Sequence, residues 1–206
     1  MKDIIKIGQL RHSLLKNTDS FKILFMIKLN RMKLTNNSTE YGFISKTFHW
    51  LSAAVLIIQI PLGFYLVDMD FSERRLTVES IHVTLGLSIF YLTLLRLIYK
   101  TLNPTPRLSH SLFPGQKIIA KLNHIFLYIA ILTITISGAL KKLYNGEELD
   151  MFFFNLEIKD NFELAETFYE IHIVGNYTLI TLISLHIFAV IVHKLLFKEN
   201  LLKRIL

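Results

Sequence analysis

The sequence predicts an all-α fold, a bundle of four transmembrane helices, and three observations lead to this prediction. The 206 residues are 52% hydrophobic, with 16 Phe and only 19% charged residues. Four long apolar segments alternate with polar ones. The basic and acidic residues also fall in different polar segments. Soluble domains of this size are rarely so apolar, so the membrane class is indicated before any helix is placed.

The four apolar segments each approach the length of about 20 residues that a spanning helix needs. Their interiors lack charged residues except for Arg96, which lies close enough to the end of the second segment to reach the interface. Pro61 and Gly63 interrupt the first segment, which buried spans tolerate when neighbouring helices satisfy the backbone. The predicted spans are Thr47–Val67, Ile81–Tyr99, Leu122–Leu140 and Ile171–His193.

The distribution of basic residues predicts the orientation of the bundle. Residues 1–46, 96–121 and 194–206 together hold 18 of the 23 Lys and Arg residues. The two remaining loops, 68–79 and 141–170, hold five basic and twelve acidic residues. Cytoplasmic loops carry the excess of Lys and Arg, so both termini and the middle loop are expected in the cytoplasm. A net charge of +7 spread in this way indicates topology and does not predict a nucleic-acid partner.

The chain divides into a basic N-terminal extension, residues 1–40, and a transmembrane domain, residues 41–206. The apolar stretches within residues 1–31 are too short to span a bilayer and lack a small-residue cleavage site, so a signal peptide is not expected. Two interpretations stay equally open. The extension forms a helix on the membrane surface, or Met32 is the true start and the extension is an upstream artefact.

The polar segments are predicted to be connectors. Residues 103–106, Asn-Pro-Thr-Pro, form a stiff turn after the second span. The loop 141–170 contains the aromatic patch Met151-Phe152-Phe153-Phe154, which suits the outer membrane interface.

Four histidines occupy positions that suggest a function. His172 and His186 are 14 residues apart in the fourth span, which corresponds to roughly 21 Å along a helix and to nearly the same helical face. His49 and His82 lie at the beginning of the first and second spans. In the predicted topology, depth pairs His82 with His172 near the outer side, and His49 with His186 near the inner side.

Two histidine pairs at two depths suit the axial ligation of two stacked haems. The chain has no cysteine, so thiolate ligands and covalent haem attachment are excluded, and any haem is b-type. Bis-histidine ligation fills both axial positions of the iron, which suits electron transfer. Gly86 and Gly175 lie on the faces of His82 and His172, where a flat macrocycle needs room.

Each histidine also has a structural interpretation in place of ligation. A single histidine near a helix end often meets water or lipid headgroups, but ionisable residues well inside a span are usually functional. His124 also begins a span at the inner side and competes with His49 as the partner of His186. His193 is expected at the interface, and His12 and His110 in solvent.

With these motifs distributed over its length, the chain resembles the bacterial cytochrome b561 family of four-helix, di-haem membrane proteins. The resemblance covers roughly Ser45 to Leu206. It rests on His49-Trp50, Ile81-His82-Val83-x-x-Gly86, Arg96 with Asn103-Pro104-Thr105-Pro106, His172-x13-His186, and the basic tail Phe197-Lys198-Glu199-Asn200-Leu201-Leu202-Lys203-Arg204.

The resemblance implies a set of roles. It gives the haem-iron ligand positions to His49, His82, His172 and His186, and it gives none to His124. It implies two non-covalent haem b groups and exchange of electrons with ubiquinone. Some members are understood to oxidise superoxide at the outer face, so the enzyme activity it implies is that of a superoxide:quinone oxidoreductase. The N-terminal extension and the acidic loop 141–170 depart from the family pattern and leave the electron donor open.

Three functions are compatible with these residues. The leading hypothesis is a di-haem electron-transfer protein of the bacterial inner membrane, working between an outer-face donor and the quinone pool. The alternative is the cytochrome b membrane anchor of a respiratory dehydrogenase, such as a hydrogenase or formate dehydrogenase. The third is a non-redox transporter that uses intramembrane histidines for protons or metal. A visible spectrum separates the third from the others, and co-purification of a soluble subunit separates the second from the first.

Overall fold

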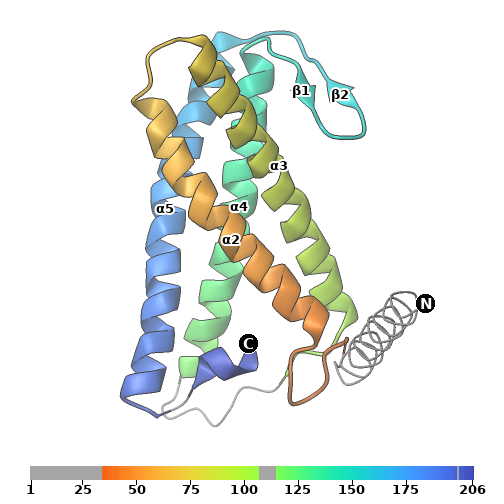
Figure 1. Cartoon of the computed structure of the whole chain (residues 1–206), viewed down its shortest axis with the longest axis vertical. Helices are drawn as coiled ribbons and strands as arrows, with labels where there is room; N and C mark the ends of the chain where they lie inside the picture. The colour runs from red at the N-terminus through yellow and green to blue at the C-terminus, as the bar shows by residue number, and fades with distance from the viewer. Residues whose placement is uncertain (1–33, 107–114, 199) are drawn as a thin grey trace, which may run out of the picture.

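The computed structural model describes residues 34–106, 115–198 and 200–206, and within them four long antiparallel helices form a bundle (Figure 1). The predictions for residues 1–31, His12 and His110 lie outside the described residues. The helices are α2 (Phe43–Val67), α3 (Glu73–Leu102), α4 (Gln116–Tyr144) and α5 (Phe162–Leu195), with a hairpin of β1 (Leu149–Asp150) and β2 (Asn155–Leu156) and a C-terminal turn η1 (Leu201–Arg204). All four helices are long and apolar enough to cross a membrane, so the predicted four-helix transmembrane fold is confirmed.

The helices extend beyond the apolar segments that predicted them, because caps in the loops set where they begin. The Ser72 side chain accepts a hydrogen bond from the Arg75 backbone N–H, and α3 therefore begins at Glu73, eight residues before the expected start of the span at Ile81. The Asn161 side chain accepts one from the Leu164 N–H in the same way. Such caps satisfy N–H groups that the first turn leaves unpaired. The extra turns therefore belong to the water-facing ends of the helices.

Side-chain exposure matches a bundle surrounded by lipid. Helix α4 packs along α5, α2 along α3, and α3 against α4. Leu87, Ile89 and Leu179 are buried between helices, whereas Ile57 and Phe188 are 73% and 63% exposed. Large apolar side chains on the outside of long apolar helices face hydrocarbon in a membrane. The chain is therefore a multi-pass membrane protein.

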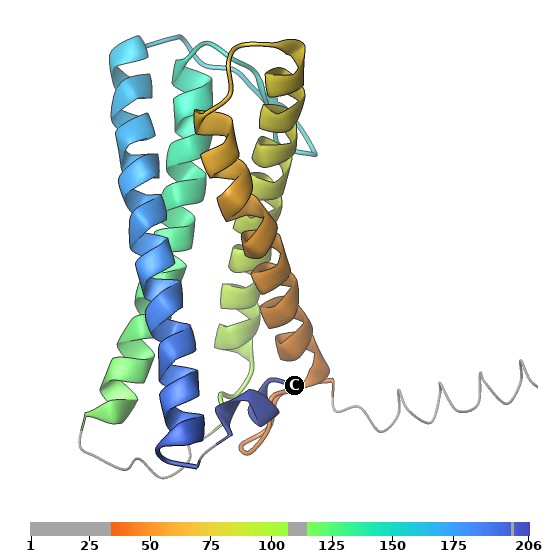
Figure 2. The same cartoon turned by 60° about the vertical axis from the view of Figure 1, so that its left-hand side comes forward.

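The two ends of the bundle differ in charge and in structure. The start of α2, the end of α3, the start of α4 and the end of α5 lie at one end, together with η1 (Figure 2). This is the end with the excess of basic residues. There the Trp50 indole N–H donates to the Ile205 carbonyl at 2.9 Å, which ties the C-terminal turn to α2. We refer to this as the inner end and to the opposite one as the outer end, in keeping with the predicted orientation.

The loop between α4 and α5 forms a hairpin at the outer end, which the sequence did not predict. Strands β1 and β2 are antiparallel, with Leu149 opposite Leu156. Leu149 is 1% exposed and packs in a cluster with Leu87 and Leu143. Each strand has only two residues, which is too short for an alternating pattern to be recognised. The hairpin is therefore held to the bundle by a buried leucine.

Candidate functional site

The structure brings His82 of α3 and His172 of α5 together near the outer end. Their ring centroids are 6.2 Å apart and their planes are inclined at 73°. Both rings are largely withdrawn from solvent among the helices. We call these two residues the outer pair.

The inner end holds three histidines. The ring centroids of His49 in α2 and His186 in α5 are 6.4 Å apart, with planes inclined at 54°. The ring of His124 in α4 lies 5.2 Å from that of His186, at 86°. We call His49 and His186 the inner pair. All four predicted ligands therefore lie in pairs, and the competing histidine lies beside one of them.

The separation within each pair fits an iron held between two imidazoles. A bond of about 2.0–2.1 Å from metal to each nitrogen, plus roughly 1.2 Å from nitrogen to ring centre, puts two axial rings about 6.4 Å apart. The outer and inner pairs, at 6.2 and 6.4 Å, match this separation. The 5.2 Å between His124 and His186 is too short for it. Neutral imidazole is also a common ligand of haem iron, and a chain without cysteine has no thiolate to take its place.

Two glycines make room for the outer pair. A Cβ added to Gly138 of α4 would lie 3.0 Å from the His172 ring, and one added to Gly63 of α2 would lie 3.1 Å from the His82 ring. Sequence reasoning missed this role, treating Gly63 only as a helix breaker. The glycines it chose have other neighbours, because a Cβ at Gly86 would meet the Gln59 amide at 3.4 Å and one at Gly175 would meet Ile134 at 2.8 Å.

Hydrogen bonds orient the outer pair. Nδ1 of His172 lies 2.8 Å from the carbonyl oxygen of Ile134, to which only a protonated Nδ1 can donate. The other nitrogen, Nε2, is then free to bind a metal. The Gln59 amide donates to the His82 carbonyl at 2.9 Å and fixes that turn of α3. Among the described residues, Nδ1 of His82 and Oε1 of Gln59 are buried without a hydrogen-bond partner, as in a polar site built for a further group.

Positive charge surrounds the inner pair. A guanidinium nitrogen of Arg96 lies 3.1 Å from Nδ1 of His49. The Arg96 guanidinium and the Lys100 ammonium also lie 5.5 and 5.0 Å from the centre of the Tyr128 ring. Sequence reasoning placed Arg96 near a helix end and among the residues that carry the family resemblance, but it did not predict a contact with a histidine. The structure adds it to the surroundings of the inner pair.

The remaining described histidines make other contacts. Nδ1 of His124 lies 2.6 Å from the carbonyl oxygen of Ala120, one turn earlier in its own helix. Nε2 of His193 lies 2.6 Å from the Gln116 side-chain nitrogen, at the inner end of the bundle. His193 is thus at the end of its span, as the interfacial prediction expects.

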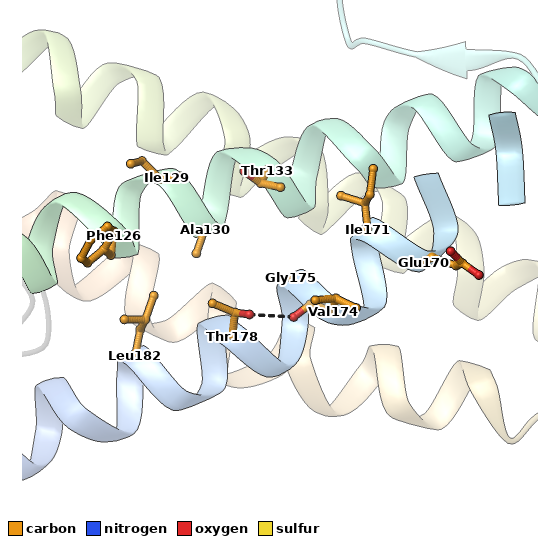
Figure 3. A pocket seen from close by; sticks show the side chains of 10 residues that line it. All are labelled: Phe126, Ile129, Ala130, Thr133, Glu170, Ile171, Val174, Gly175, Thr178 and Leu182. Atoms are coloured by element: carbon orange, nitrogen blue, oxygen red, sulfur yellow. Dashed lines mark hydrogen bonds between the residues drawn. The ribbon is translucent and has the colours of Figure 1, made fainter. Parts of the chain in front are cut away.

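A separate cavity lies between α4 and α5 (Figure 3). It has a volume of about 530 Å³ and is lined mainly by apolar side chains. The polar residues of the lining are Glu170, Thr133 and Thr178. The Thr178 hydroxyl donates to the Val174 carbonyl at 2.9 Å. None of the four predicted ligands lines this cavity, so we assign it no part in the site.

Two histidine pairs at two depths in a bundle of spanning helices are the arrangement that the sequence analysis expected of a membrane cytochrome of the b type. Comparison with known proteins agrees with this class. The sequence profile of the prokaryotic cytochrome b561 family matches residues 40–206, and the chain belongs to this family. It is therefore a bacterial membrane protein of electron transport, and membership implies b-type haem.

Two relatives show how far the similarity extends. The chain is 26% identical over 179 residues to "Cytochrome b561 homolog 2" of Escherichia coli strain K12, covering 85% of this chain and 95% of the relative. It is 24% identical over 171 residues to "Probable superoxide oxidase CybB" of Yersinia pestis, covering 81% of this chain and 96% of the relative. Each match covers most of both proteins, so the similarity concerns the whole bundle.

Proposed function

We propose that this chain is a di-haem cytochrome b of the bacterial inner membrane that moves single electrons between a donor at the outer face and ubiquinone. The observation that carries the proposal is the presence of two histidine pairs with ligand-like separations of 6.2 and 6.4 Å. They are stacked along α5, where His172 and His186 are about 21 Å apart by helical rise. Two redox centres at different depths provide a route across the membrane.

The four histidines would hold the two groups, His82 with His172 and His49 with His186. Haem b held by these histidines would supply the one-electron chemistry of its iron. The chain itself places these ligands on three helices, where all four are partly buried. The Ile134 carbonyl keeps His172 in the tautomer with a free Nε2.

Superoxide is the donor that we propose to test first, because one relative carries the name of a probable superoxide oxidase. The outer loops are acidic and repel an anion at long range, although salt screens this beyond roughly 8–10 Å. Two pairs of adjacent basic residues lie at this end, Arg74-Arg75 and Lys141-Lys142. Arg75 already donates to the carbonyls of Leu66 and Met69, and Lys142 pairs with Glu147. Arg74 and Lys141 are therefore the better candidates for guiding an anion.

Ubiquinone is the acceptor that we propose, and the family resemblance and the membrane-spanning fold support it. The family resemblance implies ubiquinone, which dissolves in the bilayer that the four helices cross. The charge asymmetry of the two bundle ends supports a cytoplasmic inner end, including the C-terminus. A cytoplasmic reporter fused after Leu206 should be active and an exported phosphatase at the same point silent. The reverse result would exchange the sides of the two histidine pairs.

The donor is tested by stopped-flow spectroscopy of the purified, oxidised haem-loaded protein. Mixing with superoxide should produce the reduced haem bands, and superoxide dismutase added beforehand should abolish them. Subsequent addition of a short-chain ubiquinone should reoxidise the haem. Reduction that dismutase does not affect, or no reduction, would exclude superoxide as the donor.

The alternative function, the membrane anchor of a respiratory dehydrogenase, makes a different prediction. An anchor should retain a soluble partner subunit when it is extracted in mild detergent. Isolation of the chain alone, with superoxide-dependent haem reduction, favours the proposed function. Stoichiometric recovery of a dehydrogenase subunit would favour the anchor.

A further inference from the structure

We propose that the hairpin between α4 and α5 inserts three phenylalanines, Phe152, Phe153 and Phe154, into the outer leaflet of the membrane. We call them the hairpin phenylalanines. They are 47%, 85% and 55% exposed, so about half or more of each side chain is left uncovered by the rest of the protein. The inference rests on the membrane-spanning fold and is independent of the electron donor and acceptor.

The depth of the hairpin phenylalanines follows from their contact with Tyr91. The rings of Phe152 and Phe153 lie 6.0 and 6.3 Å from the Tyr91 ring, and the Tyr91 hydroxyl donates to the Met151 carbonyl at 3.2 Å. Tyr91 belongs to α3, which is long and apolar enough to span the membrane. Figure 1 shows the hairpin folded back beside α3.

The length of α3 fixes how deep Tyr91 must be. Its 30 residues measure about 45 Å, which exceeds a hydrocarbon core of about 30 Å by roughly 15 Å. Tyr91 is 18 residues from the first residue, Glu73, or about 27 Å along the helix. Even if the whole excess projected from the outer side, the Tyr91 backbone would lie roughly 12 Å inside the hydrocarbon. Rings packed on its side chain are thus at the level of the outer leaflet.

The backbone conformation of the turn and its hydrogen bonds hold these phenylalanines in place. Phe152 has a φ of 69°, a left-handed conformation that is unusual for a bulky aromatic residue. It is supported by the Phe152 N–H, which donates to the Asp150 carboxylate at 2.7 Å, and by the Met151 N–H, which donates to the Phe154 carbonyl at 2.9 Å. On the other side, buried Leu149 attaches the hairpin to Leu87 and Leu143. The leucine is buried against the bundle, whereas the phenylalanines lie along the outside of α3 beside Tyr91 and stay partly exposed.

Lipid is the occupant that these positions favour. Phenylalanine side chains are wholly apolar, so their transfer from water into the hydrocarbon of the membrane is favourable. The acidic residues of the same loop, Glu148 and Glu157, lie outside the turn that carries the phenylalanines. The hairpin would then cover the outer half of α3, including Val83 next to His82, from the lipid side.

Spin labelling tests the inference directly, because the chain contains no cysteine that would have to be removed. Phe153→Cys and Phe154→Cys variants of the full chain are labelled with a nitroxide and placed in vesicles of phosphatidylethanolamine and phosphatidylglycerol. Power saturation measures the collision of each label with oxygen, which concentrates in lipid, and with a neutral nickel chelate, which stays in water. Ile57→Cys on the exposed face of α2 is the lipid reference, and Glu148→Cys in the same loop is the water reference.

The Phe153 and Phe154 labels should show an oxygen-to-nickel ratio severalfold above that of the Glu148 label and close to that of the Ile57 label. A ratio equal to that of Glu148 would overturn the proposal, because the hairpin would then be in water. Low collision with both reagents would also overturn it, because a protein surface would then cover the phenylalanines.

Discussion

The outer and inner histidine pairs have similar ring separations but different surroundings. At the outer pair, glycines at positions 63 and 138 lie against the two rings, and the Ile134 carbonyl holds His172. At the inner pair, a third histidine lies 5.2 Å from His186, and Arg96 contacts His49. The neighbours of the outer pair are thus glycines and a backbone carbonyl, whereas the neighbours of the inner pair are charged and titratable side chains.

This difference predicts that the inner pair must change a hydrogen bond before it binds metal, and that His172 of the outer pair need not. Arginine can only donate, so Nδ1 of His49 accepts from Arg96 and the proton of a neutral ring then sits on Nε2. A ring that binds metal through Nε2 must carry its proton on Nδ1. Arg96 therefore has to leave His49 before His49 can act as a ligand. The outer pair needs no such change at His172.

The largest expected effect is the loss of one haem when an outer ligand is removed. His82→Ala should lower the haem content by half, because no other described histidine lies beside His172 to replace it. The inner haem should keep its spectrum. Haem per chain and the reduced optical bands provide the measurement, and His193→Ala is the control. Loss of both haems together would mean that the two pairs do not act as separate sites.

Substitution at the inner pair should have a smaller effect than His82→Ala, and it shows which histidine pairs with His186. We expect His49→Ala to open or empty the inner haem, whereas His124→Ala should change the spectrum little. The reason is that His49 and His186 have a ligand-like separation and His124 and His186 do not. Carbon monoxide binding to the reduced protein reports the open axial position. If only His124→Ala binds carbon monoxide, the assignment of His49 is incorrect.

A smaller effect is expected from filling the space beside His172. In Gly138→Ala the new methyl group would lie 3.0 Å from the ring, whereas in Gly86→Ala it would meet the Gln59 amide at 3.4 Å. Overpacking of this kind typically costs about 1–3 kcal/mol. Gly138→Ala should therefore retain the outer haem several times more weakly than Gly86→Ala, as measured by haem transfer to apomyoglobin. Equal retention of haem in the two variants would mean that the space left by Gly138 does not matter for haem binding.

The smallest effect concerns pH and the loop at the outer end. Burial alone would raise the pKa of the Glu147 carboxyl, but hydrogen bonds from Lys142 and Asn145 lower it below 4.5 overall. A lowered pKa stabilises the folded loop above pH 4.5, and this contribution is lost as the pH falls through the lowered value. Because the pair is partly exposed, we expect less than about 1 kcal/mol. Hydrogen exchange at residues 146–150 should show the loss in the wild type and not in Glu147→Gln.

The sequence was sufficient for the bundle and for the pairing of the histidines by depth. The apolar segments predict spans because a bilayer requires continuous helices, and a 14-residue spacing keeps His172 and His186 on one face. The roles of Gly138 and Arg96 could not be predicted, because they depend on how α4 and α3 are rotated about their axes. A glycine beside a histidine of another helix leaves no local pattern. The hairpin was missed for the same reason, since a distant leucine cluster holds it.

The central claim is that each chain holds two haems between four histidines. The most direct measurement is the number of b-type haems per chain, from the pyridine haemochrome of the purified protein and its concentration by amino-acid analysis. We expect two haems per chain, both with the spectrum of six-coordinate iron. One haem per chain, or none, would contradict the account.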